Sequence, residues 1–122
     1  MSKILVAEDD ELFGEMLGKT LESAGHQVVR VHDGGEALRL YNPATVDLVL
    51  TDLVMPDMEG TELIMRLSER YPGVKIIAMS GGGRNRPEAY LSVAGQLGAA
   101  RTLAKPFSNT DLFAAIAAVL QP

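Results

Sequence analysis

The sequence predicts a doubly wound α/β fold, in which helices cover both faces of one parallel β-sheet. Apolar runs of strand length alternate with longer segments of helical periodicity, five times in all, with no linker, repeat or low-complexity segment between them. The longer strand-like runs are almost continuously apolar, which is typical of strands buried on both faces. We therefore expect five βα units and a binding site beyond the carboxyl ends of the strands.

Local signals place each element along the chain. The predicted strands are residues 4–7, 28–31, 46–51, 74–79 and 102–104. The predicted helices are residues 11–24, 35–41, 59–70, 88–97 and the segment after Ser108. Gly25 ends the first predicted helix. The second and third helices end before Pro43 and Pro72, because the residue before a proline avoids helical dihedral angles. Ser108 forms a capping box with Asp111. The apolar residues of the first helix recur at helical spacing: Leu12, Phe13, Met16, Leu17 and Leu21.

Composition limits the kinds of partner. The chain has 122 residues, a formal net charge of −5 and no cysteine. We expect a single domain over residues 1–122. Its acidic surface argues against direct binding to nucleic acid or insertion into a membrane, and no run reaches membrane-spanning length. With no export signal, we expect a cytoplasmic protein, as a monomer or weak dimer, that acts on a downstream protein target.

Polar side chains follow four of the predicted strands. Glu8 and Asp9 follow the first, Asp52 the third, Ser80 the fourth and Lys105 the fifth. Singly, each has an ordinary explanation as a helix cap, a turn residue or a solvated surface charge. Because the carboxyl ends of parallel strands meet at one edge of a sheet, their joint occurrence predicts one phosphoryl-transfer site.

The chemistry of these residues favours a metal-assisted acceptor. Three carboxylates in one place repel each other unless a cation is present, and an all-oxygen ligand set suits Mg²⁺. Asp52 is the better candidate nucleophile because it stands alone, facing the acidic pair Glu8 and Asp9. An aspartate can form an acyl phosphate while Mg²⁺ and Lys105 neutralise charge on the phosphoryl oxygens.

The chain resembles the response-regulator receiver domain of two-component signalling, the CheY-like class, over its whole length. The motifs that carry the resemblance are residues 4–10, residues 52–56 with Gly60, Ser80, residues 97–99 and residues 105–107. The resemblance implies a flavodoxin-like, five-stranded sheet of order 2-1-3-4-5 with five helices. It also implies a signalling protein that catalyses its own phosphorylation and dephosphorylation but is not an enzyme.

The resemblance also assigns roles to the site residues. Asp52 would accept the phosphoryl group from a sensor histidine kinase or a phosphotransfer protein and signal through a conformational change. Asp9 would bind Mg²⁺ directly and Glu8 through water, with Asp52 and the carbonyl of Val54 completing the metal site. Ser80 would be the switch hydroxyl and Lys105 the phosphate-contacting cation.

Three further expectations concern the end of the chain and the output surface. The resemblance implies a cis peptide bond before Pro106. Thr102 occupies the position where the family usually has an aromatic switch residue, so we expect the glycine run 81–83 and the helix carrying Tyr90 and Leu91 to transmit the signal. Since the last helix runs almost to residue 122, we expect a stand-alone receiver without an output domain, although a receiver cut from a longer chain fits equally.

Other classes share parts of this pattern. A phosphorylation-independent binding module on the same fold would be expected to lack one or more site residues. A haloacid-dehalogenase-like phosphatase needs a second aspartate two residues after the nucleophile, where this chain has Val54. A flavodoxin needs a hydroxyl-rich phosphate loop after the first strand, where residues 8–10 are acidic.

Overall fold

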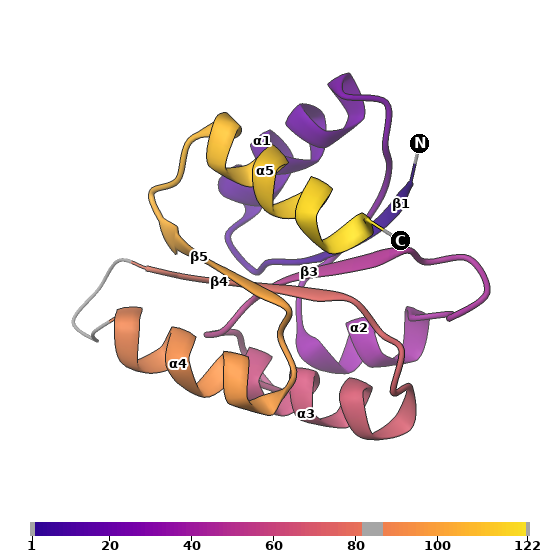
Figure 1. Cartoon of the computed structure of the whole chain (residues 1–122), viewed down its shortest axis with the longest axis vertical. Helices are drawn as coiled ribbons and strands as arrows, with labels where there is room; N and C mark the ends of the chain where they lie inside the picture. The colour runs from indigo at the N-terminus through magenta and orange to yellow at the C-terminus, as the bar shows by residue number, and fades with distance from the viewer. Residues whose placement is uncertain (1, 82–86, 122) are drawn as a thin grey trace.

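The computed structural model describes the backbone of residues 2–81 and 87–121, and the side chains of residues 2–81 and 92–121. Its strands are β1 (Lys3–Ala7), β2 (Gln27–Val31), β3 (Leu48–Asp52), β4 (Ile76–Gly81) and β5 (Arg101–Lys105). Its helices are α1 (Glu11–Ser23), α2 (Gly34–Leu40), α3 (Gly60–Arg70), α4 (Pro87–Leu97) and α5 (Asn109–Leu120). The sheet is parallel with the order β2-β1-β3-β4-β5 (Figure 1), which confirms the predicted fold.

Two strands begin later than the sequence predicts. The prediction that β3 begins at Val46 and β4 at Val74 is wrong, because the backbone N–H groups of both residues close turns, onto the carbonyls of Asn42 and Tyr71. An apolar run alone does not distinguish a strand residue from a buried turn residue. Both strands also extend further at their carboxyl ends than predicted, and Asp52 is the last residue of β3 rather than the first loop residue.

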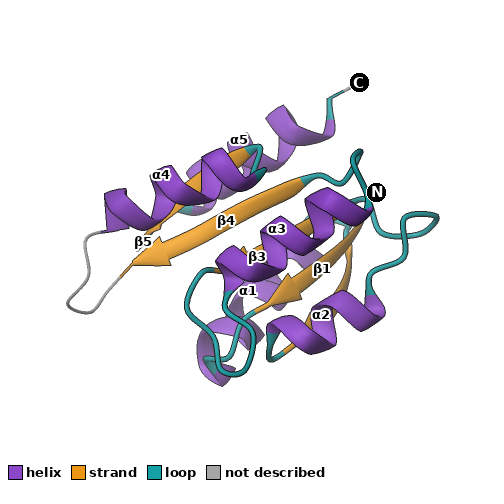
Figure 2. Ribbon diagram, turned by 90° about the horizontal axis from the view of Figure 1, so that it is seen from below, coloured by secondary structure: helices purple, strands orange, loops and turns teal. Residues whose placement is uncertain are grey.

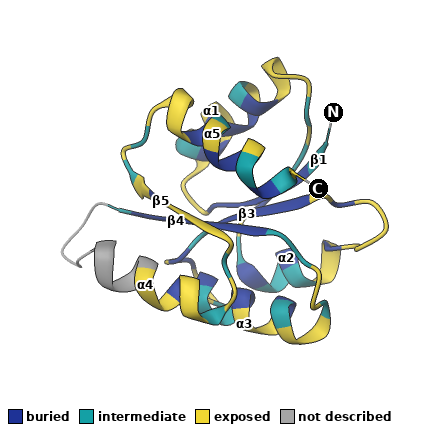
Figure 3. Cartoon of the chain, in the orientation of Figure 1, coloured by how far each residue is buried: buried dark blue, intermediate teal, exposed yellow. Residues whose placement is uncertain are grey.

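Helices cover both faces of the sheet. Helices α1 and α5 lie on one face, and α2, α3 and α4 lie on the other (Figure 1). Successive residues of β1 point to opposite faces, so that Leu5 and Ala7 join the apolar cluster under α2, α3 and α4, while Ile4 and Val6 join the cluster under α1 and α5. This double burial explains why the central strands are continuously apolar and are buried along their length (Figure 3).

Helix α1 turns a narrower face to the sheet than the sequence suggests. Phe13, Leu17 and Leu21 pack on the cluster under α1 and α5. Leu12 and Met16 belong to the same apolar series in the sequence, but their side chains are 79% and 58% exposed. A helix lying on a sheet buries a stripe at spacings of four residues, and Leu12 and Met16 each precede this stripe by one residue, about 100° around the axis.

Polar side chains fix the starts of three helices. Asp10 accepts a hydrogen bond from the N–H of Phe13 at 3.0 Å, and Asp33 and Ser108 cap α2 and α5 in the same way. Gly25 follows α1 with a φ of +95°, a backbone conformation that favours glycine. Among the described residues, no helix is both long enough and apolar enough to cross a bilayer.

The parallel register brings distant residues to one edge. Asp52 is opposite Met79, the residue before Ser80, and Gly81 is opposite Lys105. The arrowheads of β1 and β4 point the same way (Figure 2), so the loops that follow the strands emerge at a common edge. The fold therefore positions the predicted site residues together.

Candidate functional site

Three carboxylates and one lysine meet at the carboxyl edge of the sheet. Glu8 and Asp9 follow β1, Asp52 ends β3 and Lys105 ends β5. Each of the three acidic residues offers a carboxylate oxygen that lies within 4.8 Å of the others. The Nζ atom of Lys105 donates hydrogen bonds to Glu8 and to Asp52. The structure thus brings together four residues that are up to 97 positions apart in the chain.

Glu8 is the most buried of the three acids. Its side chain is 1% exposed, and it accepts hydrogen bonds from the backbone N–H of Asp10 at 3.0 Å and from Lys105 at 2.7 Å. Burial raises the pKa of the Glu8 carboxyl above its ordinary value, although the hydrogen bond from Lys105 opposes the shift; the charge of Asp52 raises it further. The ionised form of Glu8 is therefore disfavoured in this environment, and a bound cation would stabilise it.

Asp52 uses its two carboxylate oxygens differently. Oδ1 accepts the backbone N–H of Leu53 at 2.7 Å, and Oδ2 accepts Lys105 at 3.2 Å. The loop that follows folds back tightly, since the N–H of Gly60 donates to the carbonyl of Leu53 at 2.9 Å. A Cβ atom at position 60 would collide with the carbonyl oxygen of Asp52, so only glycine fits this approach. The start of α3 thereby fixes the strand end that carries Asp52.

Lys105 is held on several sides. Its side chain is 20% exposed, and besides Glu8 and Asp52 its ammonium lies 4.4 Å from the ring centroid of Phe13. Burial alone would lower the pKa of Lys105, but the hydrogen bond to Glu8 and the charges of Asp52 and Glu8 outweigh it, so that the pKa is raised. The amine is therefore charged at neutral pH. The peptide bond between Lys105 and Pro106 is cis.

Ser80 and Gly81 line the edge between Asp52 and Lys105. Ser80 is 5% exposed and pairs with Ala104 in the sheet. Gly81 lies against the backbone of Lys105, and a Cβ at this position would come within 2.7 Å of the Lys105 carbonyl oxygen. Gly81 thus permits β4 and β5 to approach where both carry site residues.

The expected output residues are only partly within the described chain. Thr102 is exposed on β5, next to a hollow whose other wall is formed by alanines of α5. The backbone of α4 is described, but residues 82–86 and the side chains of Tyr90 and Leu91 lie outside the described part. Val54, whose carbonyl was expected at the metal site, is half exposed in the loop after β3.

The donor set fits a hard divalent cation. Glu8, Asp9 and Asp52 offer only carboxylate oxygens, and together with Lys105 they leave a formal charge of −2. Oxygen ligands at an exposed edge, with room for retained water, suit Mg²⁺ better than a softer metal. Asp9 is exposed, so its carboxylate is accessible to an ion from solvent.

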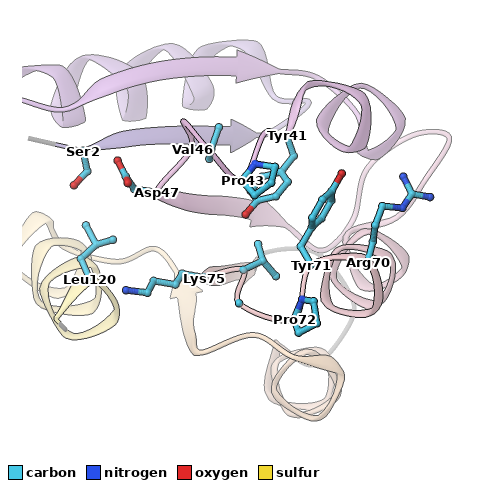
Figure 4. Close-up of a pocket in the computed structure, with 12 residues that line it drawn as sticks. Ser2, Tyr41, Pro43, Val46, Asp47, Arg70, Tyr71, Pro72, Lys75 and Leu120 are labelled. Atoms are coloured by element: carbon cyan, nitrogen blue, oxygen red, sulfur yellow. The ribbon is translucent and has the colours of Figure 1, made fainter.

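The hollow shown in Figure 4 lies at the opposite end of the molecule. Its volume is about 560 Å³, and Tyr41 and Tyr71 lie side by side in its wall with ring centroids 4.9 Å apart. Ser2 and Lys75, which also line it, come before or at the start of their strands. It is therefore separate from the carboxylate cluster, which occupies the carboxyl ends.

The sequence did not single out Phe13 as a site residue. Apolar periodicity assigns it to the core, and it does pack against the core cluster under α1 and α5. Its second role, beneath the ammonium of Lys105, depends on a contact between α1 and β5 that no local pattern encodes. Its place two residues after the acidic segment 8–11 was the available signal.

Comparisons with known proteins agree with this geometry. The family model described as the response regulator receiver domain matches residues 4–117. Response regulator receiver protein CpdR of Brucella abortus is 41% identical over 81 residues, which cover 66% of this chain and 68% of that protein. Transcriptional regulatory protein GlrR of Escherichia coli is 35% identical over 113 residues, which cover 93% of this chain but only 25% of GlrR.

Solved structures show the same architecture. A response regulator receiver domain protein from Clostridium thermocellum superposes with a TM-score of 0.91 at 28% identity, over 98% of this chain and 94% of that one. The chain belongs to the response-regulator receiver domain family of two-component signalling. It spans about a quarter of the length of GlrR.

Proposed function

We propose that residues 1–122 act as one receiver domain, which accepts a phosphoryl group on Asp52 from a sensor histidine kinase or a phosphotransfer protein. The observation that carries the proposal is the convergence of Glu8, Asp9, Asp52 and Lys105, with both lysine hydrogen bonds directed at the carboxylates. Membership of the receiver family supports the same assignment.

Asp52 acts as the nucleophile in this proposal. One of its carboxylate oxygens attacks the phosphorus of a phosphohistidine, a P–O bond forms, and the P–N bond breaks with its electron pair left on the imidazole nitrogen. Negative charge shifts from the carboxylate of Asp52 to the transferred phosphoryl group, and Lys105 changes its hydrogen-bond acceptor from Asp52 to a phosphoryl oxygen. Ser80 offers its hydroxyl as a donor to another phosphoryl oxygen.

Glu8, Asp9 and Asp52 are the side chains that would hold Mg²⁺, with the Val54 carbonyl as a further ligand. Bound there, the ion supplies positive charge that offsets repulsion between the carboxylates and an incoming phosphate donor. Glu8 already accepts hydrogen bonds on both of its oxygens, which supports a role through water rather than direct ligation. Asp9 is exposed, which supports direct ligation.

Signalling in this proposal follows from a change of hydrogen-bond partners at the carboxyl edge of the sheet. Once Asp52 carries a phosphoryl group, Lys105 and Ser80 gain new acceptors, and the strand ends β4 and β5 are biased toward the arrangement that satisfies them. The product of phosphorylation is thus a changed surface for a downstream protein partner, rather than a released product as in an enzyme.

Phosphorylation by a small donor tests the proposal. We expect acetyl phosphate to add one phosphoryl group, detected by intact mass, in the presence of Mg²⁺ but not in EDTA. Asp52→Asn should abolish the adduct. Asp57→Asn is the matched control, because Asp57 is an exposed acid of the same loop with a φ of 65°, a conformation that asparagine also adopts. An adduct that persists in Asp52→Asn or forms equally in EDTA would refute the assignment.

Titration with Mg²⁺ tests the metal ligands separately. Asp9→Ala should lose most of the affinity, and Glu8→Ala should lose less, if Asp9 binds the ion directly and Glu8 through water. Asp57→Asn again serves as the control and should bind like the wild type. The reverse order of Asp9→Ala and Glu8→Ala would contradict the division of roles.

A further inference from the structure

The ammonium of Lys105 lies over the face of an aromatic ring. Its Nζ atom is 4.4 Å from the centroid of Phe13, a distance at which the negative face of the ring attracts a cation. Among the described side chains, Lys105 therefore has three partners, the carboxylates of Glu8 and Asp52 and the ring of Phe13. The first two are acidic groups of the site, and the third is neutral.

The fold holds this ring in place. The backbone N–H of Phe13 donates to the capping carboxylate of Asp10 at 3.0 Å, so the first turn of α1 is fixed. Glu11 binds Arg30 of β2 at 3.0 Å and ties the same turn to the sheet. Phe107 packs against the Phe13 ring edge to face, with centroids 6.0 Å apart and an interplanar angle of 84°.

The three partners of Lys105 respond differently to a cation. When the carboxylates of Glu8 and Asp52 share their charge with Mg²⁺, their attraction for the ammonium weakens. The Phe13 ring does not ligate Mg²⁺, so its attraction for the lysine persists. The attraction of the ring is thus the one of the three that a bound Mg²⁺ would leave unchanged.

We propose that Phe13 is a positioning residue that holds Lys105 for contact with the transferred phosphoryl group. This inference rests on the proposed function of Asp52 and adds a residue to it. The ring acts through Lys105 and makes no contact with the reacting atoms. It contributes more when the carboxylates are engaged by the ion than when they are free.

Three variants separate this role from simple packing. Phe13→Leu removes the ring, Phe13→Tyr keeps an aromatic face, and Phe107→Leu removes a comparable apolar side chain from the same contact while leaving the ring of Phe13 present. Thermal unfolding of each variant checks that it is folded. The first readout is the NMR shift of the Lys105 ε-protons in EDTA, which a ring beneath the amine moves upfield.

We expect Phe13→Leu to lose the upfield shift of Lys105 and to be phosphorylated by acetyl phosphate about three- to tenfold more slowly at saturating Mg²⁺. Its affinity for Mg²⁺ should stay within about twofold of the wild type, because the ring is not a metal ligand. Phe13→Tyr should restore both the shift and the rate. Phe107→Leu should be slowed less than Phe13→Leu, because the ring of Phe13 loses one packing neighbour but stays beneath the amine.

The outcomes distinguish this inference from the proposed function. If the wild type is phosphorylated but Phe13→Leu keeps the wild-type rate, the positioning role is wrong and the function stands. If Phe13→Tyr and Phe107→Leu are as slow as Phe13→Leu, the ring acts by packing alone and the role is also wrong. If the wild type takes up no phosphoryl group, the proposed function fails and the role of Phe13 fails with it.

Discussion

The Nζ atom of Lys105 donates to Oε1 of Glu8 at 2.7 Å, which is the shorter of its two hydrogen bonds to the acidic cluster. In this arrangement the lysine neutralises a buried acid and also occupies Oδ2 of Asp52, a candidate metal ligand. We therefore expect a bound Mg²⁺ to compete with the lysine for the carboxylates, which would leave the ammonium available for a phosphoryl oxygen.

Removal of the lysine should separate metal binding from phosphorylation. Lys105→Met takes away the competing charge, so the affinity for Mg²⁺ should rise, by about threefold to tenfold, while phosphorylation by acetyl phosphate should slow by about a hundredfold. Calorimetric titration and intact mass measure the two effects. Lys75→Met, at the opposite end of the sheet, should change neither; weaker Mg²⁺ binding in Lys105→Met would contradict the competition.

The pKa of Glu8 predicts how stability depends on pH without metal. Its pKa is raised from an ordinary value of 4.5, so the folded state binds more protons than the unfolded state between the two values. Its stabilising contribution is therefore complete below about pH 4.5 and is lost as the pH rises through the raised value. In EDTA, the wild type should lose stability relative to Glu8→Gln over that window, as urea unfolding would show.

Addition of Mg²⁺ should reverse this difference. The ion stabilises the ionised site of the wild type and has less to bind in Glu8→Gln, so at neutral pH the wild type should gain more stability from Mg²⁺. A difference between the two proteins that does not change with pH in EDTA would show that burial of Glu8 carries no electrostatic cost.

Ser80 should matter more for the conformational response to phosphorylation than for the rate of phosphoryl transfer. Ser80→Ala removes the hydroxyl proposed to contact the phosphoryl group but leaves Asp52, the other acids and Lys105 in place, so the phosphorylation rate should fall by less than about tenfold. The backbone shift changes on addition of beryllofluoride, a phosphoryl analogue, should be largely lost at β4 and β5. Equal losses in both assays would contradict this division between Ser80 and Lys105.

Gly60 should be intolerant of even a methyl group. A Cβ there collides with the backbone of Asp52 and Leu53, which cannot move aside as a flexible side chain can, so Gly60→Ala should destabilise the protein by about 2 kcal/mol or more and slow phosphorylation. Gly73→Ala is the matched control, because no atom lies within 4 Å of a Cβ there. Equal stabilities of the two variants would refute a special role for Gly60.

Much of the fold and of the acidic site could be predicted from the sequence, because both follow from local patterns. Continuous apolar runs predict parallel strands, and parallel strands bring their carboxyl ends together, which places Asp52 beside Glu8 with no knowledge of the structure. The exposure of Leu12 and Met16 could not be predicted, because helical spacing allows a wider apolar stripe than the sheet covers.

Contacts between distant elements account for the rest. The ring of Phe13 lies under Lys105 because the fold brings the start of α1 to the carboxyl end of β5. Gly81 is small because Lys105 pairs opposite it. The local pattern around each residue does not predict which distant residue it contacts. The expected transmission of the signal through residues 81–83 and Tyr90 remains a prediction, since most of these positions lie outside the described residues.

The most direct test of the central claim is to identify the atom that carries the phosphoryl group. Protein phosphorylated by acetyl phosphate with Mg²⁺ is reduced with borohydride, which converts an aspartyl phosphate to homoserine, and the modified peptide is sequenced by mass spectrometry. We predict homoserine at position 52 and at no other acidic residue. Reduction at Asp9 or Asp57, or a stable phosphate on Ser80 with Asp52 unmodified, would contradict the account.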